Sequence, residues 1–168
     1  MTRELIEEPI DPDLDPDPAR PQWEPVRDQV TLLGVIALGG SVGALARYGL
    51  AQLWPTPVGG FPWATFTTNV LGCFLIGVLM VLITDVWMAH RLLRPFLGVG
   101  ILGGFTTFST YASEIRNLLQ PNTIGLAFGY LAGTLICALL ATMLAVRLTR
   151  ATYETLHRRS HHAHRGTA

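Results

Sequence analysis

The sequence predicts an all-α membrane protein with four spanning helices, the third of them interrupted within the membrane. Hydrophobic residues make up 49% of the chain and charged residues 14%, and the mean hydropathy is +0.37. These values are too apolar for an ordinary soluble domain of this size. The apolar residues also fall into four stretches, each near the ~20 residues that a helix needs to cross the hydrocarbon core.

The chain begins with an acidic, proline-rich segment. Nine of the twelve acidic residues lie in the first 28 positions, where Asp-Pro repeats. Proline removes backbone donors and like charges repel, so this composition favours neither a helix nor a core. We therefore predict a disordered tail at 1–29. Because a positive leader followed by a short apolar run is missing, the segment is not expected to be a signal peptide.

Residues 30–148 form the predicted four-helix transmembrane domain. Short breaks with turn chemistry, WPTPVGGFP, DVWMAHRLLRP and LLQPN, separate the four predicted spans, 31–53, 63–84, 95–118 and 123–147. Backbone polar groups cannot stay unpaired in lipid, so each span should be helical unless protein or water covers an interruption. An even number of spans places both termini on one side.

Residues 149–168 form a basic, histidine-rich tail, which we predict to be disordered, with solvated histidines that bind metal only adventitiously. Cys73 and Cys137 lie in apolar runs, far from any CxxC spacing, and are expected to be small buried hydrophobic residues.

The basic residues predict the orientation. All twelve are arginine, and most flank the side of the termini and the middle loop, while the opposite loops contain none. By the positive-inside rule, both termini should be cytoplasmic, in a multi-pass protein of the cell inner (plasma) membrane.

Glycines recur where helices are expected to meet. They lie four residues apart, at Gly39 and Gly43 in the first span and at Gly125, Gly129 and Gly133 in the last. This spacing places them on one helix face and favours close helix packing or dimerisation.

The first two spans carry polar side chains at membrane depth. Arg47, near the end of the first span, either extends to an interface or supplies positive charge that raises the local anion concentration. Thr65, Thr68 and Asn69 share one face of the second span. They can hydrogen-bond to another helix or replace part of the hydration shell of an ion.

The third span contains GGFTTFSTYASE, residues 103–114. Gly103 and Gly104 weaken a helix, and the hydroxyl residues after them can bond their own backbone, so a break is predicted. A broken membrane helix frees carbonyls that can ligate a small cation, and it presents the positive N-terminus of its second half. The alternative is a kinked helix with aromatic residues in the core.

Two further groups of residues could join the polar side chains of the second and third spans in one polar track through the membrane. Phe108 and Tyr111 are three residues apart, and the positive edges of their rings would attract an anion weakly. Tyr130 and Thr134 share a face of the last span, and Glu114 lies either in this track or at its surface end.

These residues resemble the Fluc (CrcB) family of fluoride channels over about 33–140. The resemblance is carried by GGSVGALARY, FPWATFTTNVLGCFLIG and GILGGFTTFSTYASE. It implies a fluoride-selective passive channel that exports fluoride from the cytoplasm and reduces its toxicity, rather than an enzyme. It also implies an antiparallel dimer with two fluoride pores and a structural sodium ion at the centre of the dimer interface.

The resemblance implies roles for individual residues. The backbone carbonyls of Gly103 and Thr106 would hold sodium. The pore or fluoride-binding residues would be Asn69, Phe108, Tyr111, Thr65, Ser109, Thr110, Glu114, Tyr130, Thr134 and Arg47. Two positions depart from the family pattern. Tyr111 stands where the family has a phenylalanine, so its added hydroxyl could hydrogen-bond fluoride, and Ala138 replaces a usual small hydroxyl residue.

Alternatives concern the partner and the activity. The arginine bias suggests a fixed orientation and thus a heterodimer with an oppositely inserted paralogue, instead of a homodimer. A proton- or cation-coupled exporter would use Glu114 as its titrating carboxylate. A non-conducting scaffold protein would explain the glycine faces but not the aligned donors. No span places a nucleophile beside a base, so an enzyme is least expected, and no nucleic-acid partner is predicted.

Overall fold

The computed structural model describes residues 23–86 and 92–165, and within these ranges it contains helices and no strand. The elements are α1 (Trp23–Leu53), α2 (Trp63–Val81), η1 (Leu82–Val86), η2 (Pro95–Leu102), α3 (Gly103–Phe105), α4 (Phe108–Leu118) and α5 (Ile124–Arg165), where η denotes a π-helix. Three helical segments are long and apolar enough to cross a membrane: Asp28–Leu53, Trp63–Thr84 and Ile124–Thr155. The all-helical membrane class is therefore confirmed.

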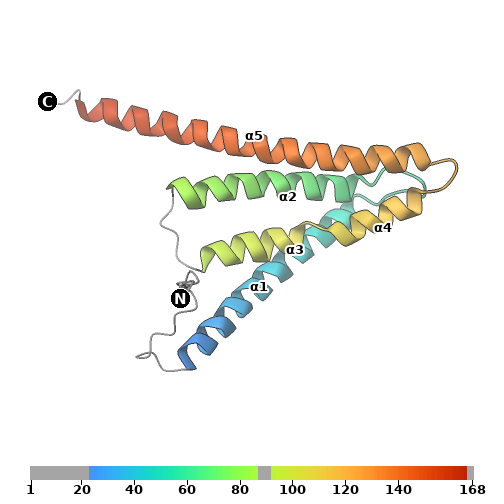
Figure 1. The fold of residues 1–168 in the computed structure, drawn as a ribbon, viewed down its shortest axis with the longest axis horizontal. Helices are drawn as coiled ribbons and strands as arrows, with labels where there is room; N and C mark the ends of the chain where they lie inside the picture. Colours follow the sequence, from blue (N-terminus) through green and yellow to red (C-terminus); the bar gives the residue numbers. More distant parts are fainter. Residues whose placement is uncertain (1–22, 87–91, 166–168) are drawn as a thin grey trace, which may run out of the picture.

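The predicted third span is helical but interrupted. Elements η2 and α3 end at Phe105, Thr106 and Thr107 are extended (φ −75°, ψ 156° and φ −147°, ψ 124°), and α4 begins at Phe108. The break predicted in this segment is confirmed. Figure 1 shows α1, α2, the interrupted segment and α5 running back and forth, so that α1 begins and α5 ends at the same end of the molecule.

Two predicted tail boundaries are wrong. Helix α1 already begins at Trp23, because Pro25 lies in its first turn, where proline is tolerated. Helix α5 continues through Arg165 instead of giving way to disorder at residue 149, because no proline or glycine interrupts the chain after Gly133 until Gly166. Residues 1–22 and 166–168 lie outside the described residues, as do the side chains of the tail histidines.

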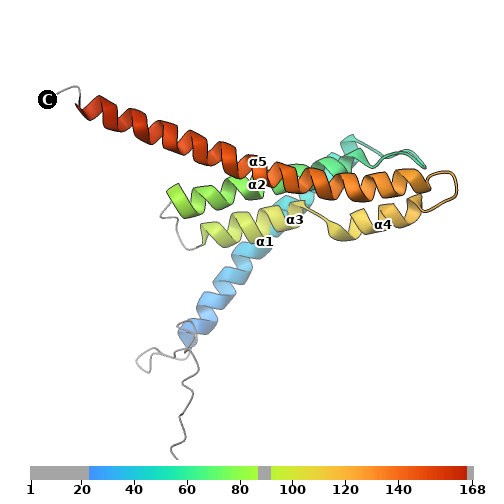
Figure 2. The same ribbon diagram turned by 45° about the horizontal axis from the view of Figure 1, so that its top comes forward.

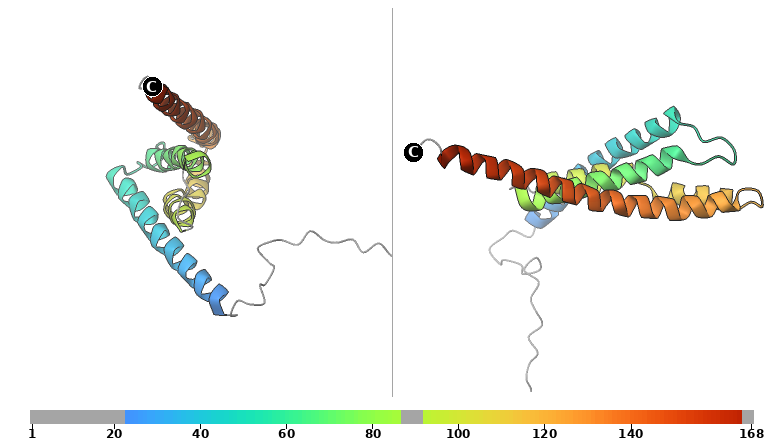
Figure 3. Two further views of the ribbon diagram at one scale, coloured as in Figure 1. Left: turned by 90° about the vertical axis from the view of Figure 1, so that its left-hand side faces the viewer. Right: turned by 90° about the horizontal axis from the view of Figure 1, so that it is seen from above.

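The segments pack as two pairs. Helix α2 lies along α5, and α1 crosses η2 and α3. Figure 2 shows α5 passing over the other segments, and the end-on view of Figure 3 shows α1 leaning away from α5. The interrupted segment therefore lies between α1 on one side and α2 and α5 on the other, and side chains of all three helices can reach its break.

The glycine face of α1 explains its close contact with η2 and α3. A Cβ at Gly43 would overlap the carbonyl of Ile101, and one at Gly39 would lie 3.0 Å from Cα of Gly100. The predicted close packing of the first span is therefore confirmed. At Gly125, Gly129 and Gly133 an added Cβ meets no described atom within 4 Å, so the described chain does not pack closely there, and dimerisation through this face stays a prediction.

An aromatic cluster marks the end of the molecule opposite the termini. The Phe61 ring lies 5.2 Å from the ring of the fully buried Tyr130, and Trp54 stacks on Trp63 with their centroids 6.2 Å apart. Both tryptophans are about half exposed. Half-exposed tryptophans of this kind are typical of a membrane–water interface.

Candidate functional site at the interrupted helix

Asn69 on α2 holds the backbone at the break. Its Nδ2 donates to the carbonyl of Thr107 at 3.0 Å, and the Thr107 N–H donates to Asn69 Oδ1 at 2.8 Å. Lipid offers no hydrogen-bond partners, so these two bonds satisfy backbone groups that the break has released. The face that Thr65, Thr68 and Asn69 share was predicted either to hydrogen-bond another helix or to replace part of the hydration shell of an ion. Asn69 makes the first kind of contact.

Thr107 begins helix α4 as its N-cap. Its Oγ1 accepts from the N–H of Thr110 at 3.2 Å and donates to Thr110 Oγ1 at 3.0 Å. A threonine side chain at this position satisfies one of the free N–H groups of the first turn. The Thr110 hydroxyl thus takes part in the cap, while Ser109 lies exposed beside it, its Oγ 3.4 Å from Thr107 Oγ1.

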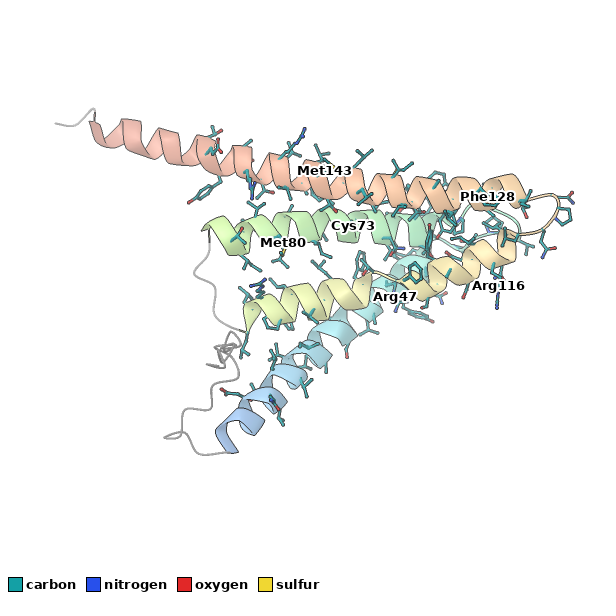
Figure 4. The ribbon with its side chains drawn as sticks, in the orientation of Figure 1. Arg47, Cys73, Met80, Arg116, Phe128 and Met143 are labelled. Carbon is teal, nitrogen blue, oxygen red and sulfur yellow. The ribbon has the colours of Figure 1, made fainter. Side chains whose placement is uncertain are left out.

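Arg47 on α1 binds the other side of the break. Its Nε donates to the carbonyl of Gly104 at 3.2 Å, and Figure 4 shows Arg47 beside α3. A helix end that presents free carbonyls is stabilised by a nearby cation. Arg47 is therefore partly buried and bonded to the backbone at the break.

The two carbonyls predicted to bind sodium lose their ordinary helical partners. In an α-helix, each carbonyl accepts from the N–H four residues later. The Thr107 N–H, which would donate to the Gly103 carbonyl in a continuous helix, donates to Asn69 instead. The Thr110 N–H, which would donate to the Thr106 carbonyl, donates to Thr107 Oγ1. Both carbonyls are thus released from the helical ladder, and oxygen atoms of this kind suit a hard cation.

Glu114 connects three segments in one polar cluster. Its Oε1 accepts from Thr65 Oγ1 of α2 at 2.8 Å, and its Oε2 accepts from the Tyr130 hydroxyl of α5 at 2.7 Å. Thr65 and Tyr130 are buried. Glu114 thus lies with Tyr130, and it also lines a 310 Å³ cavity beside the loop at 54–62.

The Tyr111 hydroxyl is already engaged. It donates to the carbonyl of Leu131 on α5 at 2.7 Å, so the idea that it serves as a free donor to fluoride is wrong for this structure. The ring centroid of Tyr111 lies 6.1 Å from that of Phe108 and 5.1 Å from that of Tyr130. Phe108 itself is 80% exposed at the surface of the subunit.

A groove of 280 Å³ opens beside the break. Its lining comes from α2, the break, α4 and α5: Asn69, Cys73, Ile76, Thr106, Thr107, Phe108, Tyr111, Thr134, Leu135 and Ala138. The Thr134 hydroxyl is buried and has no hydrogen-bond partner within the described chain. Thr68, by contrast, donates to the carbonyl of Ala64 in its own helix at 2.7 Å and contributes no free donor.

The groove also contains a residue for which no role is predicted. Cys73 was expected to be a buried hydrophobic residue, but it is only partly buried and lines the groove. It lies four residues after Asn69, and residues four apart share a helix face. That spacing is the signal that would have placed Cys73 beside the break.

Helices of membrane-spanning length, arranged around a broken helix whose backbone is held by side chains, define an integral membrane protein with a polar site at membrane depth. The sequence model of the family described as "CrcB-like protein, Camphor Resistance (CrcB)" matches residues 34–146. The chain therefore belongs to the CrcB family, and the resemblance stated from its motifs is confirmed.

Individual relatives are similar over most of the matched region. "Fluoride-specific ion channel FluC 2" of Nocardia farcinica is 57% identical over 130 residues, which cover 77% of this chain and 92% of the relative. "Fluoride-specific ion channel FluC 1" of Streptomyces coelicolor is 52% identical over 133 residues, covering 79% and 84%. "Fluoride-specific ion channel FluC 2" of Streptomyces avermitilis is 60% identical over 107 residues, covering 64% and 68%.

The hydrogen bond from the Tyr111 hydroxyl to the Leu131 carbonyl predicts the effect of removing that hydroxyl. Tyr111→Phe should keep the fold but remove the hydrogen bond to Leu131 of α5, costing about 0.5–1.5 kcal/mol of unfolding free energy. Thermal unfolding in detergent checks this loss. The control is Tyr48→Phe on α1, a 61% exposed side chain, which should leave stability unchanged; equal effects of the two changes would contradict the anchoring role of the hydroxyl.

Proposed function

We propose that the protein is a fluoride-selective passive channel, not an enzyme, that lets fluoride leave the cytoplasm and thereby reduces its toxicity. The similar proteins named above are fluoride-specific ion channels. The observation that carries the proposal is the groove at the break, which Thr134 lines together with the Phe108 and Tyr111 rings and where the buried Thr134 hydroxyl has no partner among the described residues. A small, strongly hydrated anion needs donors that replace its water, and positive ring edges favour an anion over a cation.

The route of the ion follows from the two cavities. One lies beside the loop at 54–62 and reaches Glu114, and the other is the groove beside the break, which reaches Tyr111 and Thr134. Between them, the Glu114 cluster leads through Tyr130, whose ring contacts Tyr111. In this cluster the Thr65 and Tyr130 hydroxyls donate their hydrogens to Glu114.

We infer that the interrupted segment is the third of four spans in the plasma membrane, with both termini cytoplasmic. The beginning of α1 and the end of α5 lie at one end of the molecule, and Arg116 lies toward the other, near the end of α4 (Figure 4). Arginines therefore concentrate at the end that bears the termini, as the positive-inside rule requires of a cytoplasmic end.

The released carbonyls support a sodium ion between two antiparallel subunits. Gly103 and Phe108 are exposed on one subunit, and a second subunit that covers them would bring its own Gly103 and Thr106 carbonyls to the same place. Sodium would supply the positive charge that these oxygen atoms lack. We expect replacement of sodium by N-methylglucamine to weaken the dimer, as measured by cross-linking in detergent; a dimer indifferent to sodium would contradict this assignment.

The second subunit is either an identical chain or a paralogue inserted the opposite way. The arginine bias favours the paralogue, because a chain with one strong orientation inserts poorly in the other. A single cysteine placed in the C-terminal tail decides the question in intact cells: labelling from one side only is expected, whereas labelling from both sides would support the homodimer.

The function is tested by fluoride efflux from proteoliposomes that contain the purified chain, with chloride as the control anion. Fast fluoride release with little chloride release is expected, either from this chain alone or with a co-reconstituted paralogue. Release that occurs only with a pH gradient would support the exporter instead. A lack of fluoride release under both conditions would contradict the channel.

The free hydroxyl of Thr134 predicts a separation of activity from stability. Thr134→Val should lower fluoride efflux by at least roughly tenfold, about 1.4 kcal/mol, without lowering unfolding stability, because this hydroxyl has no bond within the described chain to lose. Thr65→Val breaks the bond to Glu114 and should lower both quantities. Parallel loss of stability in Thr134→Val would show that its hydroxyl is structural.

A further inference from the structure

Helix α5 is much longer than a membrane span requires. It has 42 residues, which makes it about 63 Å long at 1.5 Å per residue, whereas the hydrocarbon core is ~30 Å thick. The candidate span within it ends at Thr155, and Figures 1 and 3 show the C-terminal part of α5 projecting beyond the end of α2. Residues 156–165 therefore continue the helix outside any candidate span, on the water side of the membrane; we call them the α5 extension.

The α5 extension contains four histidines, and its helical register separates three of them from the fourth. Its sequence is LHRRSHHAHR. His161 follows His157 by four residues and precedes His164 by three, and positions spaced in this way share one helix face, with about 5–6 Å between their Cβ atoms. His162 is displaced from His161 by ~100° around the helix, and the residues three and four positions from it are arginines and a glycine. A helix therefore pairs His161 twice and His162 not at all.

Paired histidines at this spacing have the chemistry of a transition-metal site. Imidazole nitrogen is an ordinary zinc ligand, and two histidines four residues apart on a helix are the pair that the H-E-x-x-H motif uses to bind zinc. Adventitious binding is what a disordered tail predicts, but α5 remains helical through Arg165. The helix holds the paired positions together before a metal arrives, so binding costs less conformational entropy.

The charges near these histidines decide how many ligands the metal needs. Arg158 and Arg165 lie beside the histidines in the sequence, and their positive charge opposes a cation. The exposed Glu154, three residues before His157, shares a helix face with it and offsets part of that charge. One imidazole beside two arginines would hold a divalent cation weakly, so the metal must be held by paired imidazoles.

We propose that His157, His161 and His164 form a zinc site on the α5 extension, with His161 as the ligand common to both pairs. Water completes the coordination. The imidazoles bind as neutral bases, and zinc that joins successive turns stabilises the end of the helix against local opening. The site lies outside the candidate spans, and zinc binding there does not depend on the passage of fluoride.

The first test measures zinc binding to the full-length chain, purified in detergent without a histidine tag. Zinc chloride is titrated calorimetrically into the natural protein, His161→Ala and His162→Ala, since alanine keeps the helix. His161→Ala should weaken binding at least roughly tenfold, because both pairs are lost, whereas His162→Ala should stay within about twofold of the natural protein. Equal affinities of the two variants, or no zinc binding by the natural protein, would overturn the proposal.

The second test detects the stabilised helix. Trypsin cleaves after Arg158 and Arg159, which lie between the ligands in the sequence, and cleavage requires local opening of the helix. Zinc at about ten times its dissociation constant should slow this cleavage about tenfold in the natural protein and in His162→Ala, but at most about twofold in His161→Ala. The last variant also controls for effects of zinc on trypsin. Unchanged cleavage of the natural protein, or equal protection of His161→Ala, would contradict a zinc site at these histidines.

Discussion

Replacing Asn69 with alanine is expected to abolish fluoride efflux and to destabilise the protein. The change removes both hydrogen bonds to Thr107 at once. Both bonds are partly buried, and a fully buried group left unpaired costs about 1–3 kcal/mol, so the loss of unfolding free energy should be at most roughly 6 kcal/mol. The extended geometry at the break would then give way, and with it the released carbonyls and the groove.

Thermal unfolding in detergent and efflux from proteoliposomes measure the two effects of Asn69→Ala. The matched control is Thr68→Val, which changes the neighbouring residue on α2. The Thr68 hydroxyl bonds only to Ala64 of its own helix, so this nearly isosteric change should leave efflux close to that of the natural protein. Asn69→Ala protein with normal stability and normal efflux would contradict the role of Asn69 in holding the break.

The other large effect is expected at Gly43 on α1, one helical turn before Arg47. In Gly43→Ala the new Cβ would overlap the Ile101 carbonyl and lie 2.8 Å from the Phe105 nitrogen. These are backbone atoms that cannot turn aside as a side chain can, so α1 must move away from η2 and α3. Overpacking of this kind typically costs about 1–3 kcal/mol, and the shift would also strain the bond from Arg47 to Gly104.

The same helix provides the control for Gly43. An added Cβ at Gly49 meets no described atom within 4 Å, so Gly49→Ala should be neutral or stabilise α1 by up to ~1 kcal/mol. Folded yield after size-exclusion chromatography and fluoride efflux should both fall in Gly43→Ala and stay normal in Gly49→Ala. Normal behaviour of both proteins would show that α1 does not pack as described.

Much of the fold could be predicted because its causes are local. Apolar stretches of spanning length predict helices in lipid, and two glycines followed by hydroxyl residues predict the break in the segment 95–118. The spacing of residues every three or four positions also marked Asn69, Tyr111 and Thr134, which line the groove. The sequence does not predict the helical continuation of α5 to Arg165, because charge and histidine content of this kind favour disorder.

By itself, the sequence determined the membrane class, the helical segments and the interruption at Thr106 and Thr107, since composition and spacing act within one segment. Only the tertiary structure decided how each polar group is used. It joined Asn69 to the broken backbone, Tyr111 to Leu131 and Glu114 to Thr65 and Tyr130, leaving Thr134 without a partner. The reason is physical: a buried donor is satisfied by whichever acceptor a neighbouring helix brings within about 3 Å, and helix packing alone sets that distance.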